Sequence, residues 1–179
     1  MPNSSAHTLA SSDVPASAPA SQTGPILEVY SRDPGYVVAS VGKYFIQITK
    51  TRLNVTGVGL MRRALTEISE RHEKFGYLSI VEPDAELTLL ADVRSGIDSI
   101  VKRFSSRMTG AAVVFEKQGF QATAVRSLVT AISVASRASH PVQVHSELQE
   151  ALSWLSGLTG GEPTVGRLLH IAKQLRIGQ

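Results

Sequence analysis

The stretch YVVASVGKYFIQIT, residues 36–49, decides how this chain begins to fold. Two runs rich in β-branched and aromatic residues, Tyr36 to Val41 and Tyr44 to Thr49, flank Gly42-Lys43, a pair suited to a tight turn. A third such run, Ile26 to Tyr30, comes earlier and is separated by the turn-favouring residues Asp33-Pro34-Gly35. These runs predict three antiparallel strands.

After residue 49 the pattern changes to helices that alternate with short apolar strands. Apolar residues at intervals of three and four, with charged residues between them, predict amphipathic helices, and compact apolar runs predict covered strands. The predicted elements are a helix over 55–74, a strand from Tyr77 to Val81, a helix over 87–107, a strand from Ala111 to Phe115, a helix that includes the apolar residues from Ala124 to Ala135, a strand from Val142 to His145, a helix after Ser146 and a helix over 164–176. We therefore predict an α/β fold: a mixed sheet with N-terminal antiparallel strands, then alternating helices and parallel strands, with the helices packed against the sheet.

Three local features refine this prediction. The uncharged run Ala111 to Phe115 is typical of a central strand covered on both faces. The helix that ends near Ala135 carries few charges, so we expect it to be more buried than the others. Ser146 and Gln149, three residues apart, predict a reciprocal capping box at the start of the following helix.

Composition limits the class of protein. The chain has 179 residues, of which 42% are hydrophobic and 18% charged, as in one domain with additional terminal segments. It has no Cys, which excludes disulfide scaffolds, thiolate catalysis and Cys-ligated metal sites. No apolar run approaches the roughly 20 residues of a membrane span, and no basic start with an apolar stretch signals export. We therefore expect a cytoplasmic protein.

The chain divides into three parts. Residues 1–24, rich in Ser, Ala and Pro with Asp13 as the only charge, predict a disordered tail. Residues 25–159 form the predicted folded domain, and residues 160–179 contain a basic amphipathic helix. The net charge of +3 divides as −1, +2 and +2 over these parts, so nucleic-acid binding is not expected. The C-terminal helix either docks on the domain or acts as an arm for a partner helix or an anionic membrane surface.

Candidate chemistry lies in the loops after the parallel strands, where α/β proteins usually bind ligands. Glu82, Asp84, Glu86 and Glu116 follow two of these strands and could together hold a divalent cation or form an acid/base pair. The favoured interpretation is that Asp84 and Glu86 cap the following helix.

Weaker signals concern glycine, histidine and Phe120. Gly57 and Gly59 at a helix start lack a phosphate-loop motif, and no two His have the spacing of a helical metal clamp. Gly119 permits a tight turn into a helix. Phe120 after it either staples that helix or protrudes as a contact residue, and we favour the staple.

Several segments together resemble the STAS-like domain proteins, which are similar to sporulation anti-sigma-factor antagonists, in a bacterial branch of myxobacterial type. The segments are FGYLSIVEP at 75–83, AVVFE at 112–116 followed by Gly119-Phe120 and AVR at 124–126, PVQV at 141–144 and EALSWL at 150–155. The resemblance spans roughly residues 25–156 and rests mainly on the order of the elements.

The resemblance implies a non-enzymatic protein-interaction domain, often switched by phosphorylation in a D-S-x-G turn at the start of the second helix. This chain has no D-S-x-G there; the matching turn is Glu82 to Thr88, and Thr88 is its only hydroxyl residue.

Our leading hypothesis is a regulatory or scaffolding interaction module without catalytic activity and without a cofactor or metal. Its partner is a protein, and self-association through a sheet edge or the C-terminal helix is a further expectation. The alternatives are a small-molecule or nucleotide carrier that binds between the strand-end loops and the helix starts near Gly57 and Gly119, and a metal-dependent hydrolase. The candidate interaction surface comprises Glu82, Asp84, Thr88, Glu116, Gly119, Phe120, Arg167, Lys173 and Arg176.

Overall fold

A computed structural model describes residues 24–117 and 119–177. The predicted disordered tail therefore lies, except for Gly24, outside the described residues. The elements in chain order are β1 (Leu27–Asp33), β2 (Tyr36–Val41), β3 (Tyr44–Thr49), α1 (Val55–Arg71), β4 (Phe75–Val81), α2 (Ala91–Phe104), a short 3₁₀ helix (Ser105–Arg107), β5 (Met108–Val114), α3 (Phe120–Ala135), β6 (Val142–His145), α4 (Leu148–Thr159) and α5 (Val165–Ile177).

The strands form one six-stranded sheet in the sequential order β1-β2-β3-β4-β5-β6. The first three strands pair antiparallel, and β3, β4, β5 and β6 pair parallel. The predicted mixed α/β sheet is confirmed. Gly42 turns the β2–β3 hairpin with a φ of +52°, a conformation that side chains with a Cβ rarely adopt.

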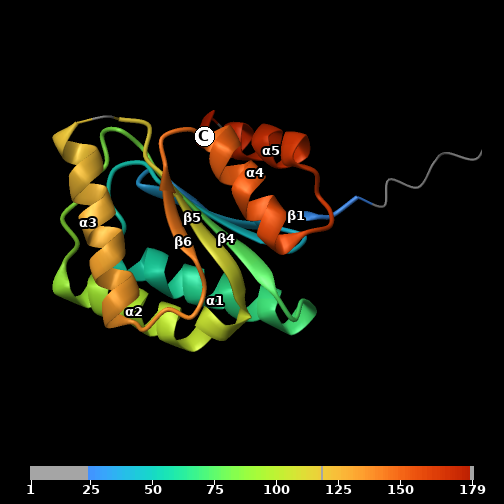
Figure 1. Cartoon of the computed structure of the whole chain (residues 1–179), viewed down its shortest axis with the longest axis horizontal. Helices are drawn as coiled ribbons and strands as arrows, with labels where there is room; N and C mark the ends of the chain where they lie inside the picture. Colours follow the sequence, from blue (N-terminus) through green and yellow to red (C-terminus); the bar gives the residue numbers. More distant parts are fainter. Residues whose placement is uncertain (1–23, 118, 178–179) are drawn as a thin grey trace, which may run out of the picture.

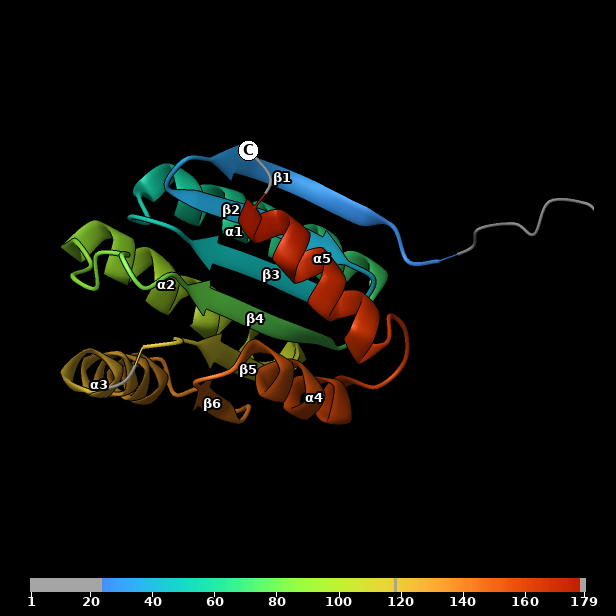
Figure 2. The same ribbon diagram turned by 90° about the horizontal axis from the view of Figure 1, so that it is seen from above.

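Helices cover both faces of the sheet (Figure 1). One core lies between the sheet and α4 with α5, and it includes the fully buried Leu152, Leu155 and Leu168. The other lies between the opposite face and α1 with α2, and it includes Phe45 and Met61. Viewed from above, α4 and α5 lie over the sheet with α1 and α2 behind it (Figure 2). Successive side chains of β2 and β3 point to opposite faces of the sheet and so enter the two cores alternately. This explains why every residue of these two strands is buried.

The C-terminal helix α5 packs with its apolar stripe on the sheet. Leu168, Ile171, Ala172 and Leu175 are buried in the same core as α4. The amide of Arg167 donates to Oγ1 of Thr164 (3.4 Å), as expected of an N-cap residue. Because this stripe is covered, it is not available as an arm for another protein in this arrangement.

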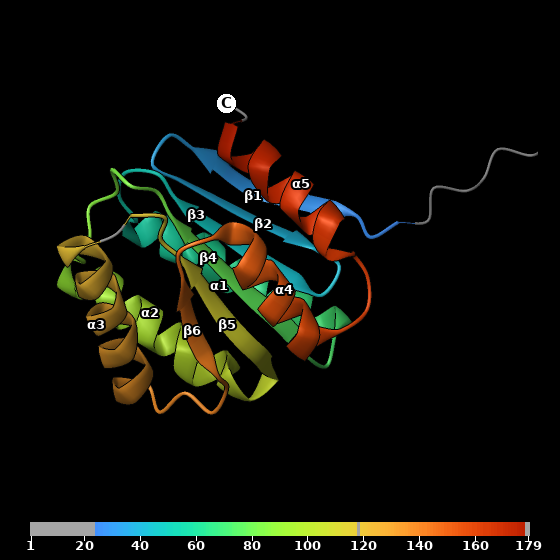
Figure 3. The ribbon, with the colours of Figure 1, turned by 45° about the horizontal axis from the view of Figure 1, so that its top comes forward.

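The expectation that α3 is more buried than the other helices is wrong. Only Ala122 and Val125 of this helix are buried, although its composition is apolar. The helix lies at the β6 edge of the sheet, beside the last strand rather than over its centre (Figure 3). A helix at an edge has sheet beneath only part of its length, so the low charge of α3 did not translate into burial.

Two predicted helix starts are also wrong. The helix predicted from residue 87 begins at Ala91, because the chain is still extended at Leu90. The capping box of Ser146 and Gln149 does not form: the N-cap of α4 is Glu147, and its side chain makes no capping hydrogen bond. With Glu147 as the N-cap, Gln149 is the second residue of the helix. A capping box needs the third, so the side chain of Gln149 cannot bond to the amide of the cap residue.

Among the described residues, no helix combines the length and the apolar character that crossing a membrane requires.

Candidate functional site

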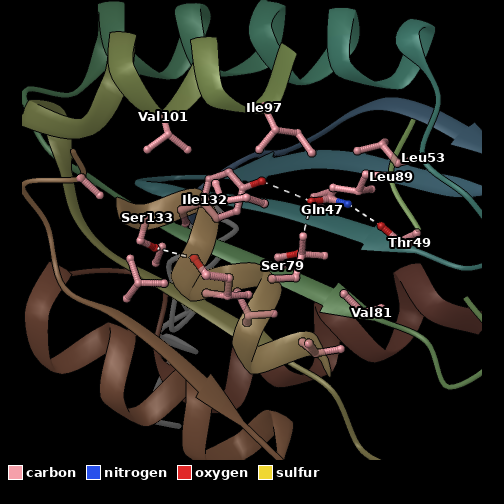
Figure 4. A pocket seen from close by; sticks show the side chains of 18 of the residues that line it. Gln47, Thr49, Leu53, Ser79, Val81, Leu89, Ile97, Val101, Ile132 and Ser133 are labelled. Carbon is pink, nitrogen blue, oxygen red and sulfur yellow. Dashed lines mark hydrogen bonds between the residues drawn. The ribbon is translucent and has the colours of Figure 1, made fainter. Parts of the chain in front are cut away.

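A cavity of about 160 Å³ lies between α2, α3 and one face of the sheet. Its floor is formed by side chains of β3, β4 and β5, and its walls by α2, α3 and the extended segment at residues 86–89. Figure 4 shows Gln47, Ser79, Ile97 and Ile132 directed into this space from four different elements. The site is therefore assembled by tertiary packing and not by one motif.

Most of the wall is apolar and incompletely buried. Leu89, Ile97, Val101, Leu128 and Ile132 all line the cavity, and each keeps part of its side-chain surface accessible. Close-packed interiors seldom leave several large apolar side chains only partly covered around one space. The loose packing of α3 thus produces a cleft that a small apolar molecule could fill.

The floor carries a compact polar cluster centred on Gln47, which is 5% exposed. Its Oε1 accepts hydrogen bonds from the hydroxyls of Tyr77 and Ser79, both at 3.2 Å. Its Nε2 donates to Oγ1 of Thr49 at 2.5 Å. The parallel register places Gln47 directly opposite Ser79 on the neighbouring strand, so the sheet itself holds this cluster together.

Tyr77 lies deep in the molecule but retains accessible surface because it lines the cavity. Burial raises the pKa of its phenol above the usual range. The hydroxyl stays protonated at neutral pH and remains a donor to Gln47. The ring also packs on Phe45 with a centroid separation of 4.9 Å, which orients the phenol toward Gln47.

Charge is sparse around this cavity. Among the described residues that line it, Glu86 is the one acidic or basic side chain apart from the imidazole of His140. Glu86 is exposed and lies 3.6 Å from Arg52. The described lining of the cavity therefore presents no lysine or arginine to an anionic ligand.

His140 also lines the cavity. Its Nδ1 is 3.0 Å from Oγ of Ser105, and that hydroxyl also accepts the amide proton of Ser139 at 2.7 Å. Burial lowers the pKa of His140, so its imidazole is neutral at pH 7. Ser105 is buried beneath the loop after α3 and is not part of the cavity wall, so the pair ties this loop to the end of α2.

Three residues of the predicted interaction surface form one ion-pair cluster. Arg176 of α5 donates to both oxygens of Glu82 (2.6 and 2.8 Å) and to both oxygens of Glu116 (3.0 and 2.8 Å). The guanidinium lowers the pKa of the Glu116 carboxyl through these hydrogen bonds. The cluster binds α5 to the carboxyl ends of β4 and β5, and both of its carboxylates are already paired with a cation of the chain.

Among the described residues, the other predicted surface residues make no hydrogen bond or ion pair with this cluster, although the charge of Lys173 also lowers the pKa of Glu116. Asp84 is 95% exposed at its side chain and lies 3.4 Å from Lys117. Thr88 is exposed in the extended segment before α2, and Arg167 and Lys173 are exposed on α5. The surface predicted as one patch is therefore distributed over several elements.

Two interpretations of single residues are wrong. Asp84 and Glu86 do not cap α2, since that helix starts only at Ala91 and they pair with Lys117 and Arg52 instead. Phe120 does not staple α3: it follows Gly119, whose φ is +82°, and it is 87% exposed. The left-handed turn at Gly119 directs the chain so that the first side chain of the helix faces solvent.

The glycine and metal alternatives gain no geometric support. The amide of Gly57 is bonded to Oδ1 of Asn54 (2.8 Å), the N-cap of α1, and a Cβ at Gly57 would lie 2.7 Å from Leu53. This glycine serves close packing and leaves no cradle for a phosphate. Within residues 24–117 and 119–177, no group of three or more His, Asp or Glu side chains is arranged to hold a metal ion.

Gln47, Tyr77 and Ser79 were not recognised from the sequence. The available signal was a polar residue in each of two otherwise apolar strands, FIQIT and YLSIV. A buried strand tolerates such a residue only when its polar group has a partner. Only the register in which the two strands pair shows that the hydroxyls of one strand are the hydrogen-bond partners of the amide on the other.

Neither the models of protein families, nor the curated proteins, nor the solved structures contain a match to this chain.

Proposed function

We propose that this protein is a small-molecule-binding module and that the cavity between α2, α3 and the sheet holds an apolar ligand. The observation that carries the proposal is a cavity of about 160 Å³ with a polar cluster at its floor and partly covered apolar walls. Ligand sites in proteins commonly combine an apolar lining with a few convergent polar groups. This corresponds to the carrier hypothesis, with the site moved from the strand-end loops to the sheet face.

The cavity volume sets the size of the ligand. A dry cavity of about 150 Å³ in a protein core is known to accept a molecule the size of benzene. A ligand of roughly six to ten non-hydrogen atoms would therefore fit, and nucleotides would not. Each Å² of apolar wall that such a ligand covers contributes about 25 cal/mol.

Binding rather than catalysis is favoured by the groups around the cavity. The hydroxyls of Tyr77 and Ser79 both donate to Gln47 and are not activated by a neighbouring base. Ser105 and His140 are within hydrogen-bond distance, but the serine lies behind the wall, where a ligand in the cavity does not reach it. These arrangements suit a recognition site.

Filling the cavity should abolish binding. We expect toluene to bind the purified full-length protein with a Kd of about 0.1–1 mM, measured by calorimetry, and to raise its melting temperature. Replacing Ile132 by Trp places an indole in the cavity and should weaken toluene binding at least about tenfold, because the ligand loses most of its contact area.

The matched control is Ala131→Trp, which adds the same side chain at an exposed position of α3. It should bind toluene as the wild type does. Absence of binding to the wild type would contradict the proposal and leave the cleft to a protein partner. Markedly tighter binding by a chain without residues 1–23 would show that those residues fill the cleft, which would also contradict it.

A second candidate function is the protein-interaction role that the resemblance to STAS-like proteins implies. The observation in its favour is that Phe120 and Val134 are 87% and 72% exposed. They are 14 residues apart on α3, which places them within about 40° of each other on the outward side of the helix. Exposed large apolar side chains on one side of a helix are typical of contact surfaces.

Replacing Phe120 by Ser should disrupt that contact. We expect proteins recovered with the wild-type chain by affinity purification from the source cell to fall at least about tenfold in the variant, since aromatic anchors dominate interfaces. The control, Val55→Ser, replaces an exposed apolar residue at the start of α1 and should recover the same proteins as the wild type. Equal recovery with Phe120→Ser would exclude this surface.

A further inference from the structure

We infer that the ligand of this cavity carries one neutral oxygen group, an alcohol or a carbonyl, that hydrogen-bonds to the cluster around Gln47. This inference rests on the proposed function and adds the chemical class of the ligand. It follows from three features of the floor: which hydrogen-bonding positions are used, which remain, and which charges are present.

The acceptor positions of Gln47 are occupied. Its carbonyl oxygen receives two hydroxyl donors, Tyr77 and Ser79, which together fill both lone pairs. In the structure the carbonyl oxygen faces these two hydroxyls, and the NH₂ group points to Thr49.

Donor positions remain at the same place. The NH₂ group of Gln47 has two hydrogens, and one is used by Thr49. The hydroxyl of Thr49 accepts that bond and, within the described part of the chain, donates to no group of its own. Two N–H or O–H donors in a site that is nine-tenths buried or more are thus left for a ligand or a water molecule.

Acceptor capacity also remains, on the oxygens of Tyr77 and Ser79. An alcohol can use both kinds of group, since it donates one proton and accepts through its lone pairs. A ketone or amide carbonyl can use the donors alone. Both would place their polar end on the floor and their apolar part against α2 and α3.

Ionised ligands are disfavoured by the charges of the site. No lysine or arginine is among the described residues that line the cavity, and the exposed carboxylate of Glu86 is at its rim. Moving a carboxylate from water into an apolar site without a cation is strongly unfavourable. Fatty acids and phosphate esters therefore fit less well than neutral molecules of the same size.

The test uses three probes that share one ring: toluene, benzyl alcohol and benzoate. Calorimetric titrations at pH 7 should show binding of toluene and benzyl alcohol to the wild type, and at least about tenfold weaker binding of benzoate. Benzyl alcohol and toluene differ in hydration, so the informative quantity is how their affinity ratio changes between proteins.

Gln47→Leu should weaken the binding of benzyl alcohol by about tenfold, because the alcohol loses hydrogen bonds. The affinity for toluene should stay the same or increase. In Thr49→Val the new side chain has nearly the same shape as threonine but no hydroxyl, so the binding of benzyl alcohol should weaken by about three- to tenfold. This variant tests the proposal if Gln47→Leu does not fold. The control Gln143→Leu makes the same substitution at an exposed position of β6 outside this cavity and should change neither affinity.

Each outcome separates the two proposals. If neither neutral probe binds the wild type, the proposed function fails and the inference with it. If both bind but their ratio is the same in the wild type, Gln47→Leu and Thr49→Val, the oxygen group is refuted and the apolar site stands. Benzoate binding as tightly as benzyl alcohol would likewise overturn the neutral class.

Discussion

Replacing Arg176 by Ala should lower the free energy of unfolding by about 2–3 kcal/mol. The side chain of Arg176 is 20% exposed and pairs with two carboxylates, Glu82 and Glu116, whose side chains are 20% and 35% exposed. Removing it leaves two partly buried like charges side by side and detaches the end of α5 from the sheet. Partial exposure places the effect below the about 3–5 kcal/mol seen for fully buried pairs.

The variant should also change the pH dependence of stability. The pKa of Glu116 is lowered from 4.5 in the folded protein, so its contribution is present above that pH and is lost as the pH falls through the lower, folded value. Urea denaturation between pH 7 and pH 3 should therefore show a steeper loss of stability below about pH 5 in the wild type than in Arg176→Ala.

Arg167→Ala is the matched control on the same helix. Arg167 is exposed, and its guanidinium donates one hydrogen bond of 3.4 Å to the carbonyl of Pro25 among the described residues, so we expect a change below about 0.5 kcal/mol. Arg176→Lys keeps the charge but cannot grip two carboxylates bidentately and should fall between the two. A loss below about 0.5 kcal/mol for Arg176→Ala would show that the cluster is only a surface feature.

Replacing Leu152 by Ala should cost about 3 kcal/mol, whereas Leu128→Ala should cost less than about 1 kcal/mol. Leu152 of α4 is 1% exposed and packs in the core between that helix and the sheet, where its removal leaves an empty space. Leu128 of α3 borders a space that is already unfilled. The two variants remove the same atoms from two helices that pack on the same sheet. The difference between their free energies of unfolding therefore reports how tightly each site is packed.

Equilibrium urea denaturation measures both values, and hydrogen exchange supplies an independent readout. Amides in α3 should exchange faster than those in α4, because α3 has fewer buried side chains. Equal costs for the two variants, with equal protection of both helices, would mean that α3 is held as firmly as α4. The cleft would then be closed to ligands, contrary to the proposed function.

The loose attachment of α3 connects the fold to the proposed function. In folds of alternating parallel strands and helices, each crossover helix normally packs on the sheet. Here the last crossover helix, α3, lies beside the edge strand β6 (Figure 3). The cavity between α2 and α3 borders part of the sheet face, including Tyr77 and Ser79. A ligand there would cover apolar surface of both helices at once, so binding should also raise the protection of α3 amides.

The order and type of the elements follow from the sequence by itself. The hairpin around Gly42, the helical spacing from Val55 onward and the apolar run from Ala111 to Phe115 are local patterns, and each is read within about ten to twenty residues. The prediction of a mixed sheet with helices on it is confirmed, because the spacing of apolar residues, every 2 residues in a strand and every 3.6 in a helix, indicates which face of the element must be covered.

The same patterns do not say what covers each face. The low charge of α3 indicated burial, but the helix lies at an edge, and Phe120 and Val134 face solvent. Helix starts were displaced by a few residues for a related reason: a polar residue suited to capping caps only if the backbone enters the helix there, and at Glu147 the entry comes one residue later than Ser146 suggested.

The sites themselves were decided by tertiary structure. The sequence placed Glu82 and Glu116 at the ends of neighbouring strands, but their common partner Arg176 lies 94 and 60 residues further along the chain. Gln47 meets Tyr77 and Ser79 only because β3 and β4 pair in one particular register. Hydrogen bonds and ion pairs act over a few ångströms, so which groups form them depends on distances that the chain acquires only when its strands and helices have packed.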